Sequence, residues 1–186
     1  MHAARKTNKN PQLLLGAERR VKFHLVDRIE SIEPGRKIVT VKALSLAEEY
    51  LADHFPAFPV LPGVLMLEAL VQSAAWLVRI QQDFAKSIIV LRSARNVRYT
   101  SFVQPGNFLR CQVEALEIGE SIAKFKAAGY VGETQTVSAR IELGCSNLAD
   151  REQRLADADK AIIAQMRQHF RLIGGPAALA AAGKAP

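Results

Sequence analysis

Alternating apolar and polar positions predict a β-rich chain. Residues 21–29 and 37–44 read as two strands, joined by a turn at Glu33, Pro34 and Gly35. Four further runs of apolar and β-branched residues predict later strands, at residues 88–94, 109–118, 122–131 and 136–143. Short turns that contain glycine separate the last three of these runs, which favours antiparallel neighbours.

One segment has a different pattern, with Glu68, Gln72 and Ser73 as the only polar side chains in residues 64–78. A helix that is apolar nearly all round belongs in a protein core, whereas a bilayer span needs ~20 residues and rarely contains an unpaired glutamate. Pro62 suits the first helical turn, where its missing N–H would have no intrahelical partner. The prediction is therefore an α+β fold, with an antiparallel sheet wrapped around a long central apolar helix.

The chain divides into four predicted parts. Residues 1–12 are polar and basic, and read as a flexible arm, while residues 13–148 hold the predicted domain. In residues 149–175 the apolar positions recur at helical spacing, which predicts an extra amphipathic C-terminal helix capped by Gly174 and Gly175. The alanine-rich residues 176–186 read as a disordered tail.

Composition narrows the classes of function. The chain has 186 residues and a net charge of +7, but only 6% of its residues are aromatic and the basic ones are scattered, so we expect no nucleic-acid partner. Cys111 and Cys145 stand alone in apolar runs, which is typical of buried thiols in a reducing compartment. The apolar patch near the N-terminus is too short for a signal peptide. We therefore expect a cytoplasmic protein with no membrane span.

Candidate chemistry lies in the segment that leads into the central helix. Three prolines within residues 56–62 stiffen an extended loop that carries His54. Burial on the helix favours the protonated form of the Glu68 carboxyl group, which can then donate a proton. Gln72 lies one turn further on the same face, where it can orient Glu68 or hold a water molecule. The free N–H of Gly63 near the helix start can bind a developing oxyanion.

Together these residues supply a base, an acid and an oxyanion donor. That combination is what removal of a proton α to a thioester carbonyl requires, with loss of a β-hydroxyl group. Each residue also has a structural interpretation when taken alone: a histidine fixed beside a rigid loop, a glutamate paired with a distant arginine, or a glycine that turns the chain.

The same segment resembles the β-hydroxyacyl-ACP dehydratases of type II fatty acid synthesis. Their motif reads roughly G-H-F-P-x-x-P-x-M-P-G-V-x-x-x-E-A-x-x-Q, and here it stands as D-H-F-P-A-F-P-V-L-P-G-V-L-M-L-E-A-L-V-Q. The resemblance covers roughly residues 21–143. It implies a hot-dog fold and reversible dehydration of 3-hydroxyacyl thioesters to trans-2-enoyl thioesters.

The resemblance also implies roles for four residues. His54 would be the base at Cα and Glu68 the acid for the departing hydroxyl group, while Gly63 and Gln72 would bind the oxyanion or substrate. The site would form at a dimer interface, so His54 and Glu68 would come from different subunits of a homodimer or higher homo-oligomer. The substrate would arrive on the phosphopantetheine arm of an acidic acyl carrier protein, with no metal and no redox cofactor.

Several positions depart from the family pattern and indicate a divergent member. Asp53 replaces the glycine before His54, Leu61 replaces the usual methionine, and Asn107 stands where aspartate is common. Two other functions stay open: a hot-dog thioesterase, in which a helix carboxylate activates water, and a non-catalytic acyl-carrier or acyl-chain binding protein. The sequence leaves open the chain length, the pathway, and whether the carrier is a protein or coenzyme A.

Overall fold

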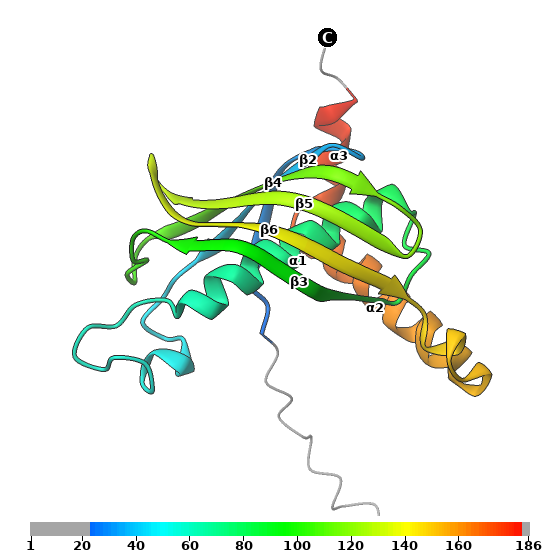
Figure 1. Ribbon diagram of the computed structural model, residues 1–186, viewed down its shortest axis with the longest axis horizontal. Coiled ribbons are helices and arrows are strands. Elements are labelled where there is room, and N and C mark those ends of the chain that lie inside the picture. Colours follow the sequence, from blue (N-terminus) through cyan, green and yellow to red (C-terminus); the bar gives the residue numbers. More distant parts are fainter. Residues whose placement is uncertain (1–22, 184–186) are drawn as a thin grey trace, which may run out of the picture.

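The computed structural model describes residues 23–183, which form one curved antiparallel sheet around a long helix (Figure 1). The elements follow in the order β1 (Arg28–Glu33), β2 (Lys37–Ala43), the 3-10 turn η2 (Glu49–Leu51), α1 (Gly63–Gln81), β3 (Ile88–Tyr99), β4 (Phe108–Ile118), β5 (Ile122–Val131), β6 (Thr134–Ser146), the 3-10 turns η3 (Leu148–Asp150) and η4 (Gln153–Leu155), α2 (Ala156–Leu172) and α3 (Gly175–Ala182).

The six strands form one sheet in the order β1-β2-β4-β5-β6-β3, and every neighbouring pair is antiparallel. Tight turns close two of the hairpins, with Gly35 at φ 72° and Gly132 at φ 57°, a left-handed conformation that glycine adopts without strain. Strands β1 and β3 lie at the two edges of the sheet, so β3 has an open edge.

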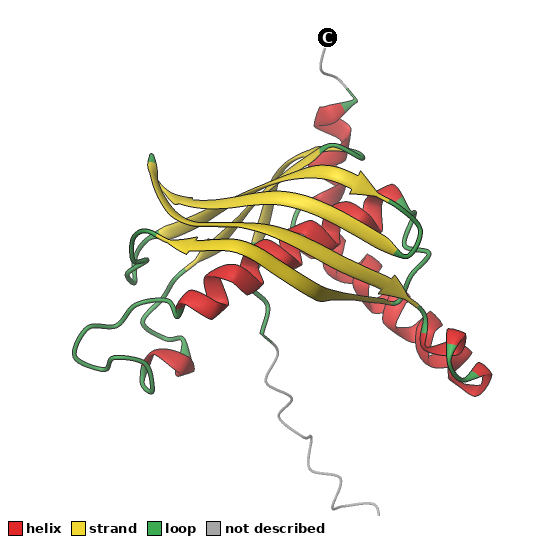
Figure 2. Ribbon diagram, viewed as in Figure 1, coloured by secondary structure: helices red, strands yellow, loops and turns green. Residues whose placement is uncertain are grey.

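The central helix α1 runs along the concave side of the sheet (Figure 2). Its buried side chains, among them Leu70, Ala74 and Leu77, pack against inward-facing strand residues such as Phe125 and Val113. By length and composition α1 could cross a membrane, but here it is the core helix of the domain. This is the hot-dog fold that the resemblance implied, and the predicted sheet and central helix are confirmed.

The C-terminal helix α2 covers the side of α1 that faces away from the sheet (Figure 1). Phe170 packs against Trp76 of α1 with ring centroids 5.9 Å apart, and against Phe84 at 5.7 Å. Gly174 ends this region in the left-handed conformation at φ 83°, as its predicted capping role requires. The predicted extra helix is therefore confirmed, although two 3-10 turns precede it.

Two sequence-based expectations were wrong. The first strand begins at Arg28, because the Phe23 carbonyl and the Leu25 N–H bond to the Gln72 side chain on α1, and only the Asp27 N–H still reaches β2, at the Val41 carbonyl. The tail predicted to be disordered forms helix α3 up to Ala182, because alanine favours helices and Ala178 is buried beside β1. The arm of residues 1–12 lies outside the described residues, and the boundaries of the predicted parts stay predictions.

Candidate active site

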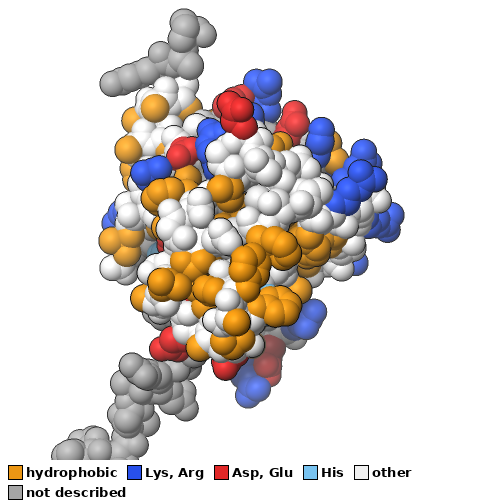
Figure 3. Space-filling view, turned by 90° about the vertical axis from the view of Figure 1, so that its left-hand side faces the viewer, with side chains coloured by type: hydrophobic (Ala, Val, Ile, Leu, Met, Phe, Trp, Pro, Cys, Tyr) orange, Lys and Arg blue, Asp and Glu red, His pale blue; other side chains and the backbone are white. Residues whose placement is uncertain are grey.

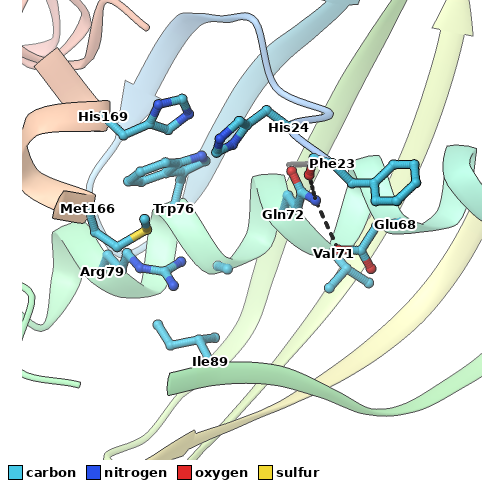
Figure 4. A pocket seen from close by; sticks show the side chains of 11 residues that line it. Phe23, His24, Glu68, Val71, Gln72, Trp76, Arg79, Ile89, Met166 and His169 are labelled. Carbon is cyan, nitrogen blue, oxygen red and sulfur yellow. Dashed lines mark hydrogen bonds between the residues drawn. The ribbon is translucent and has the colours of Figure 1, made fainter. Parts of the chain in front are cut away.

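Glu68 lies in the second turn of α1, half-buried and facing a small cavity (Figure 4). Gln72, one helical turn later, donates a hydrogen bond from Nε2 to Glu68 Oε1 at 3.0 Å. The predicted proximity of these two side chains is confirmed, because residues four apart on a helix share one face.

The amide of Gln72 also holds the segment that precedes β1. Its Oε1 accepts the N–H of Leu25 at 2.9 Å, and its Nε2 donates to the Phe23 carbonyl at 3.0 Å. Both amide N–H groups and the carbonyl oxygen of Gln72 thus have protein partners. These hydrogen bonds favour a role in positioning Glu68 over direct contact with substrate.

Gly63 is the first residue of α1, and Pro62 precedes it in an extended conformation at φ −52° and ψ 136°. The Pro62 carbonyl accepts hydrogen bonds from Leu65 and Met66, which begins the helix. A Cβ atom at position 63 would lie 3.2 Å from Cε1 of Tyr99, tighter than an ordinary contact. The glycine therefore keeps space open where the helix N–H groups are available to an acceptor.

His54 lies in the loop between η2 and α1, and its ring contacts Phe55 edge-on at 4.5 Å between centroids. Phe55 has a φ of 52°, an uncommon conformation for a bulky residue and a mark of local strain. The Leu61 N–H donates to the Val103 carbonyl at 2.9 Å, which fastens the end of this loop to the chain after β3.

His54 is not among the residues that line the cavity beside Glu68. The loop that carries it projects away from the sheet and from α1 (Figure 1). Within one chain, therefore, the structure brings Glu68 and Gln72 together and leaves His54 apart. That separation is what a site shared between two subunits requires, and the shared site stays a prediction.

The cavity has a volume of about 180 Å³ and extends along α1 from Glu68. Its lining comes from four parts of the chain: Glu68, Val71, Gln72, Ala75, Trp76 and Arg79 on α1, Ile89 on β3, Met166 and His169 on α2, and Phe23 and His24 before β1. Figure 4 shows Trp76, His24 and His169 on one side and Ile89 on the other. The rings of His24 and His169 stack at 4.4 Å.

Arg79 is the residue of this cavity that sequence reasoning missed most clearly. Its guanidinium lies over the Trp76 ring, 5.3 Å from the centroid, and its Nε has no hydrogen-bond partner among the described residues. Burial lowers the pKa of Arg79 to about 10. Its position eleven residues after Glu68 is close to three helical turns, so helical spacing could have indicated it.

Metal binding has no evident place in the described part of the chain. Residues 23–183 contain no cluster of three or more His, Cys, Asp or Glu side chains arranged to hold an ion. Glu68 and His54 are side chains of the kind that can transfer protons, and the N–H groups at the start of α1 are potential hydrogen-bond donors.

Solved structures agree with the fold. The dehydratase heterocomplex ApeI:P from Xenorhabdus doucetiae aligns with a TM-score of 0.59 at 19% identity, and covers 72% of this chain and 90% of that chain. The protein smu.793 from Streptococcus mutans, bound to acetyl CoA, aligns with a TM-score of 0.51 at 11% identity, and covers 70% and 96%. At these identities the likeness concerns the fold alone.

Sequence comparison with known proteins identifies the family of this chain. Residues 18–140 match the family of the FabA-like domain. The 3-hydroxyacyl-[acyl-carrier-protein] dehydratase FabZ of Pelotomaculum thermopropionicum is 40% identical over 124 residues, which cover 67% of this chain and 87% of that protein. FabZ of Caulobacter vibrioides is 37% identical over 130 residues, which cover 69% and 82%. The chain therefore belongs to the β-hydroxyacyl-ACP dehydratase family, with a FabA-like domain.

Proposed function

We propose that this protein catalyses the reversible dehydration of 3-hydroxyacyl thioesters, carried on acyl carrier protein, to trans-2-enoyl thioesters. The observation that carries the proposal is the position of Glu68, whose carboxyl group Gln72 holds at the edge of a cavity. The proline-rich loop with His54 precedes the helix of Glu68, and the chain belongs to the dehydratase family. Relatives named as acyl-carrier-protein dehydratases support the proposal that the substrate is bound to acyl carrier protein, and the net charge of +7 suits an acidic partner.

The proposed reaction needs two proton transfers. His54 removes a proton from Cα, and the electron pair of that C–H bond forms the Cα=Cβ double bond as the Cβ–O bond breaks. Protonated Glu68 gives its proton to the departing hydroxyl group, which leaves as water. The N–H of Gly63 donates to the thioester oxygen, where negative charge develops as the Cα proton leaves. No cofactor is required, and the setting is the cytoplasm.

A second copy of the chain would complete the site. Large apolar side chains gather on the face that carries the His54 loop (Figure 3). The side chains of Val64, Phe102 and Phe55 are 70%, 62% and 60% exposed there. Exposed apolar patches and open strand edges mark association surfaces, and β3 offers such an edge. A symmetric partner covering this face would bring its His54 loop toward Glu68 of the first copy.

The first test follows the enoyl absorbance of crotonyl-ACP during hydration. We expect His54→Ala and Glu68→Ala each to lower kcat by about 100-fold or more, because each removes a proton-transfer group. Glu133→Ala, in the exposed β5–β6 turn, serves as the control. An unchanged rate in either active-site variant removes that residue from the mechanism, and release of free thiol without hydration identifies a thioesterase.

A mixed dimer tests whether the site is shared. One subunit carries His54→Ala with one affinity tag, the other carries Glu68→Ala with a second tag, and sequential purification isolates the mixed dimer. We expect about half of the wild-type activity, because a two-fold dimer then keeps one intact site of two. An inactive mixed dimer means that His54 and Glu68 act within one chain.

A further inference from the structure

The cavity beside Glu68 continues along α1 and ends at a positive charge. Glu68 and Arg79 are eleven residues apart, which is about 16 Å along the helix axis. The Arg79 side chain points back toward the N-terminus of α1, as helical side chains do, so its guanidinium enters the cavity between Met166 and Ile89 (Figure 4).

The charge of Arg79 is poorly compensated by the protein. Burial lowers the pKa of Arg79 to about 10, so the guanidinium is still protonated at neutral pH. Its Nε has no acceptor among the described residues, and no ion pair to Arg79 occurs among them. Apart from the Trp76 ring beneath the guanidinium, this largely buried charge has no partner among the described residues, so a ligand that brings an acceptor there gains more than it would in water.

The other walls of the cavity supply no negative charge to Arg79. Glu68 is the only carboxylate among the lining residues, and it is bonded to Gln72 at the opposite end. Near Arg79 the lining is apolar or aromatic, from Ile89, Met166 and Trp76. The His24 and His169 rings lie against each other and close the upper side.

The cavity is small and partly open to solvent, so the described residues provide room for a short ligand. At about 180 Å³ it is slightly larger than an apolar cavity of about 150 Å³ that holds one benzene molecule. It is below the range of about 300–1,000 Å³ that is typical of sites for drug-sized ligands. Met166 and His169 belong to the added helix α2, so this extra element forms part of the wall.

We propose that this cavity receives a short acyl chain that ends in a carboxylate, and that Arg79 binds that carboxylate. The inference rests on the proposed function for the position of the thioester near Glu68. A guanidinium–carboxylate pair at a largely buried guanidinium is a strong, charge-assisted interaction. An acyl chain with a methyl end would instead leave Arg79 buried without an acceptor.

Calorimetric binding of two saturated acyl-pantetheines, which cannot be dehydrated, tests this inference apart from catalysis. Hexanoyl-pantetheine ends in a methyl group, and 5-carboxypentanoyl-pantetheine has the same number of chain carbons and ends in a carboxylate. We expect the wild-type protein to bind the carboxylate at least about tenfold more tightly. We expect Arg79→Met to abolish or reverse that preference and Arg79→Lys to keep part of it, because lysine retains the charge.

Arg154→Met is the matched control. Arg154 lies on η4, is exposed, forms an ion pair with Glu152 and does not line the cavity. It should leave the preference unchanged. Equal or weaker binding of the carboxylate by the wild-type protein overturns the inference, as does a preference that survives Arg79→Met. Turnover of the matching 3-hydroxyacyl-ACP substrates is measured in parallel. If the protein prefers the carboxylate but turns over neither substrate, the proposed dehydratase activity is contradicted, whereas the proposed ligand class is supported.

Discussion

Gln72 is the side chain on which the geometry of Glu68 depends. Its amide bonds Glu68 with one N–H, the Phe23 carbonyl with the other, and the Leu25 N–H through its oxygen. A side chain held at three points has little freedom to rotate, so the carboxyl group that it contacts is also restricted.

Replacing Gln72 with leucine keeps the approximate volume and removes all three hydrogen bonds. We expect kcat/KM for hydration to fall about tenfold or more, because the acid is no longer fixed in orientation. Stopped-flow measurement of the hydration rate checks this.

Gln82→Leu is the control for this change. Gln82 follows α1 and donates to the carbonyls of Gly119 and Glu120, so it too links α1 to a neighbouring segment, but far from Glu68 along the helix. A variant at Gln82 should lose stability without changing kcat/KM. A Gln72→Leu variant with the kcat/KM of the wild type would leave Gln72 with a purely structural role.

Sequence alone predicted the pairing of Glu68 with Gln72, because helical spacing decides which side chains share a face. The same spacing extended to Trp76 and Arg79 would have traced the α1 wall of the cavity. It could not have found His169 or Met166, because they reach the cavity only through the packing of α2 on α1. The local pattern specifies neighbours within an element, whereas contacts between elements depend on the whole fold.

Helix α2 is anchored to the sheet at its first turn by Asp159. This buried carboxylate accepts hydrogen bonds from the Ser87 hydroxyl and from the N–H groups of Leu148 and Ala149. Desolvation by burial raises the pKa of Asp159, but these three hydrogen bonds outweigh it, so the net pKa lies below its ordinary value. The start of β3, the turn η3 and α2 therefore meet at one carboxylate.

We expect Asp159→Asn to destabilise the protein at neutral pH and to loosen α2. Because the pKa of Asp159 is lower in the folded state, its contribution is present in full above the ordinary carboxyl pKa of about 4, and is lost as the pH falls through the folded value. The stability gap between wild type and variant should therefore close in acid. Urea unfolding at a series of pH values measures it.

Asp157→Asn is the matched control, two residues earlier on the same helix. Asp157 is exposed and its carboxylate pairs only with Lys160 among the described contacts, at 2.9 Å. Exposed pairs of this kind contribute little, so this variant should show no comparable gap. A gap for Asp159→Asn that persists unchanged in acid would mean that its charge is not what stabilises α2.

Element by element, the hairpins β4–β5 and β5–β6 were the most predictable, because turns that contain Gly119 and Gly132 join their strands, and β4 and β5 alternate along their length. The two errors occurred at the ends of the described chain. Phe23 and Leu25 lie in a stretch of strand-like composition, but a side chain of α1 takes their hydrogen bonds. The alanine-rich end lacks the charge pattern of a surface helix, but Ala178 finds a buried place near β1.

The whole molecule has one face on which large apolar side chains are exposed together, and the local sequence pattern does not reveal it. The residues of that face come from the His54 loop, the start of α1 and the chain after β3. They are far apart in the sequence, and only the fold gathers them. On the proposed assembly, this face is covered by the second subunit.

Val64→Asp tests that assembly. Val64 is 70% exposed in the first turn of α1, where an aspartate suits the helix dipole, so the single chain should remain folded. A charge in the proposed interface should weaken dimerisation by about 100-fold or more, and activity should fall with it at low protein concentration. Sedimentation velocity over a dilution series measures the dissociation constant.

Leu172→Asp is the control, and it places the same charge at an exposed leucine at the end of α2, outside the apolar face. It should leave the oligomeric state unchanged. A wild-type protein that sediments as a monomer at all concentrations, or a Val64→Asp variant that dimerises normally, would contradict the proposed interface.

The proposed sharing of the site, with His54 from one subunit and Glu68 from the other, also matters for how such proteins diverge. After a gene duplication, one copy could lose its histidine and the other its glutamate, and a pair of unlike chains would still hold one complete site. Each copy would then depend on the other, and selection would preserve their association without any gain in activity. A site divided between two subunits thus allows a homodimer to evolve into an obligate heterodimer through the loss of one catalytic side chain in each copy.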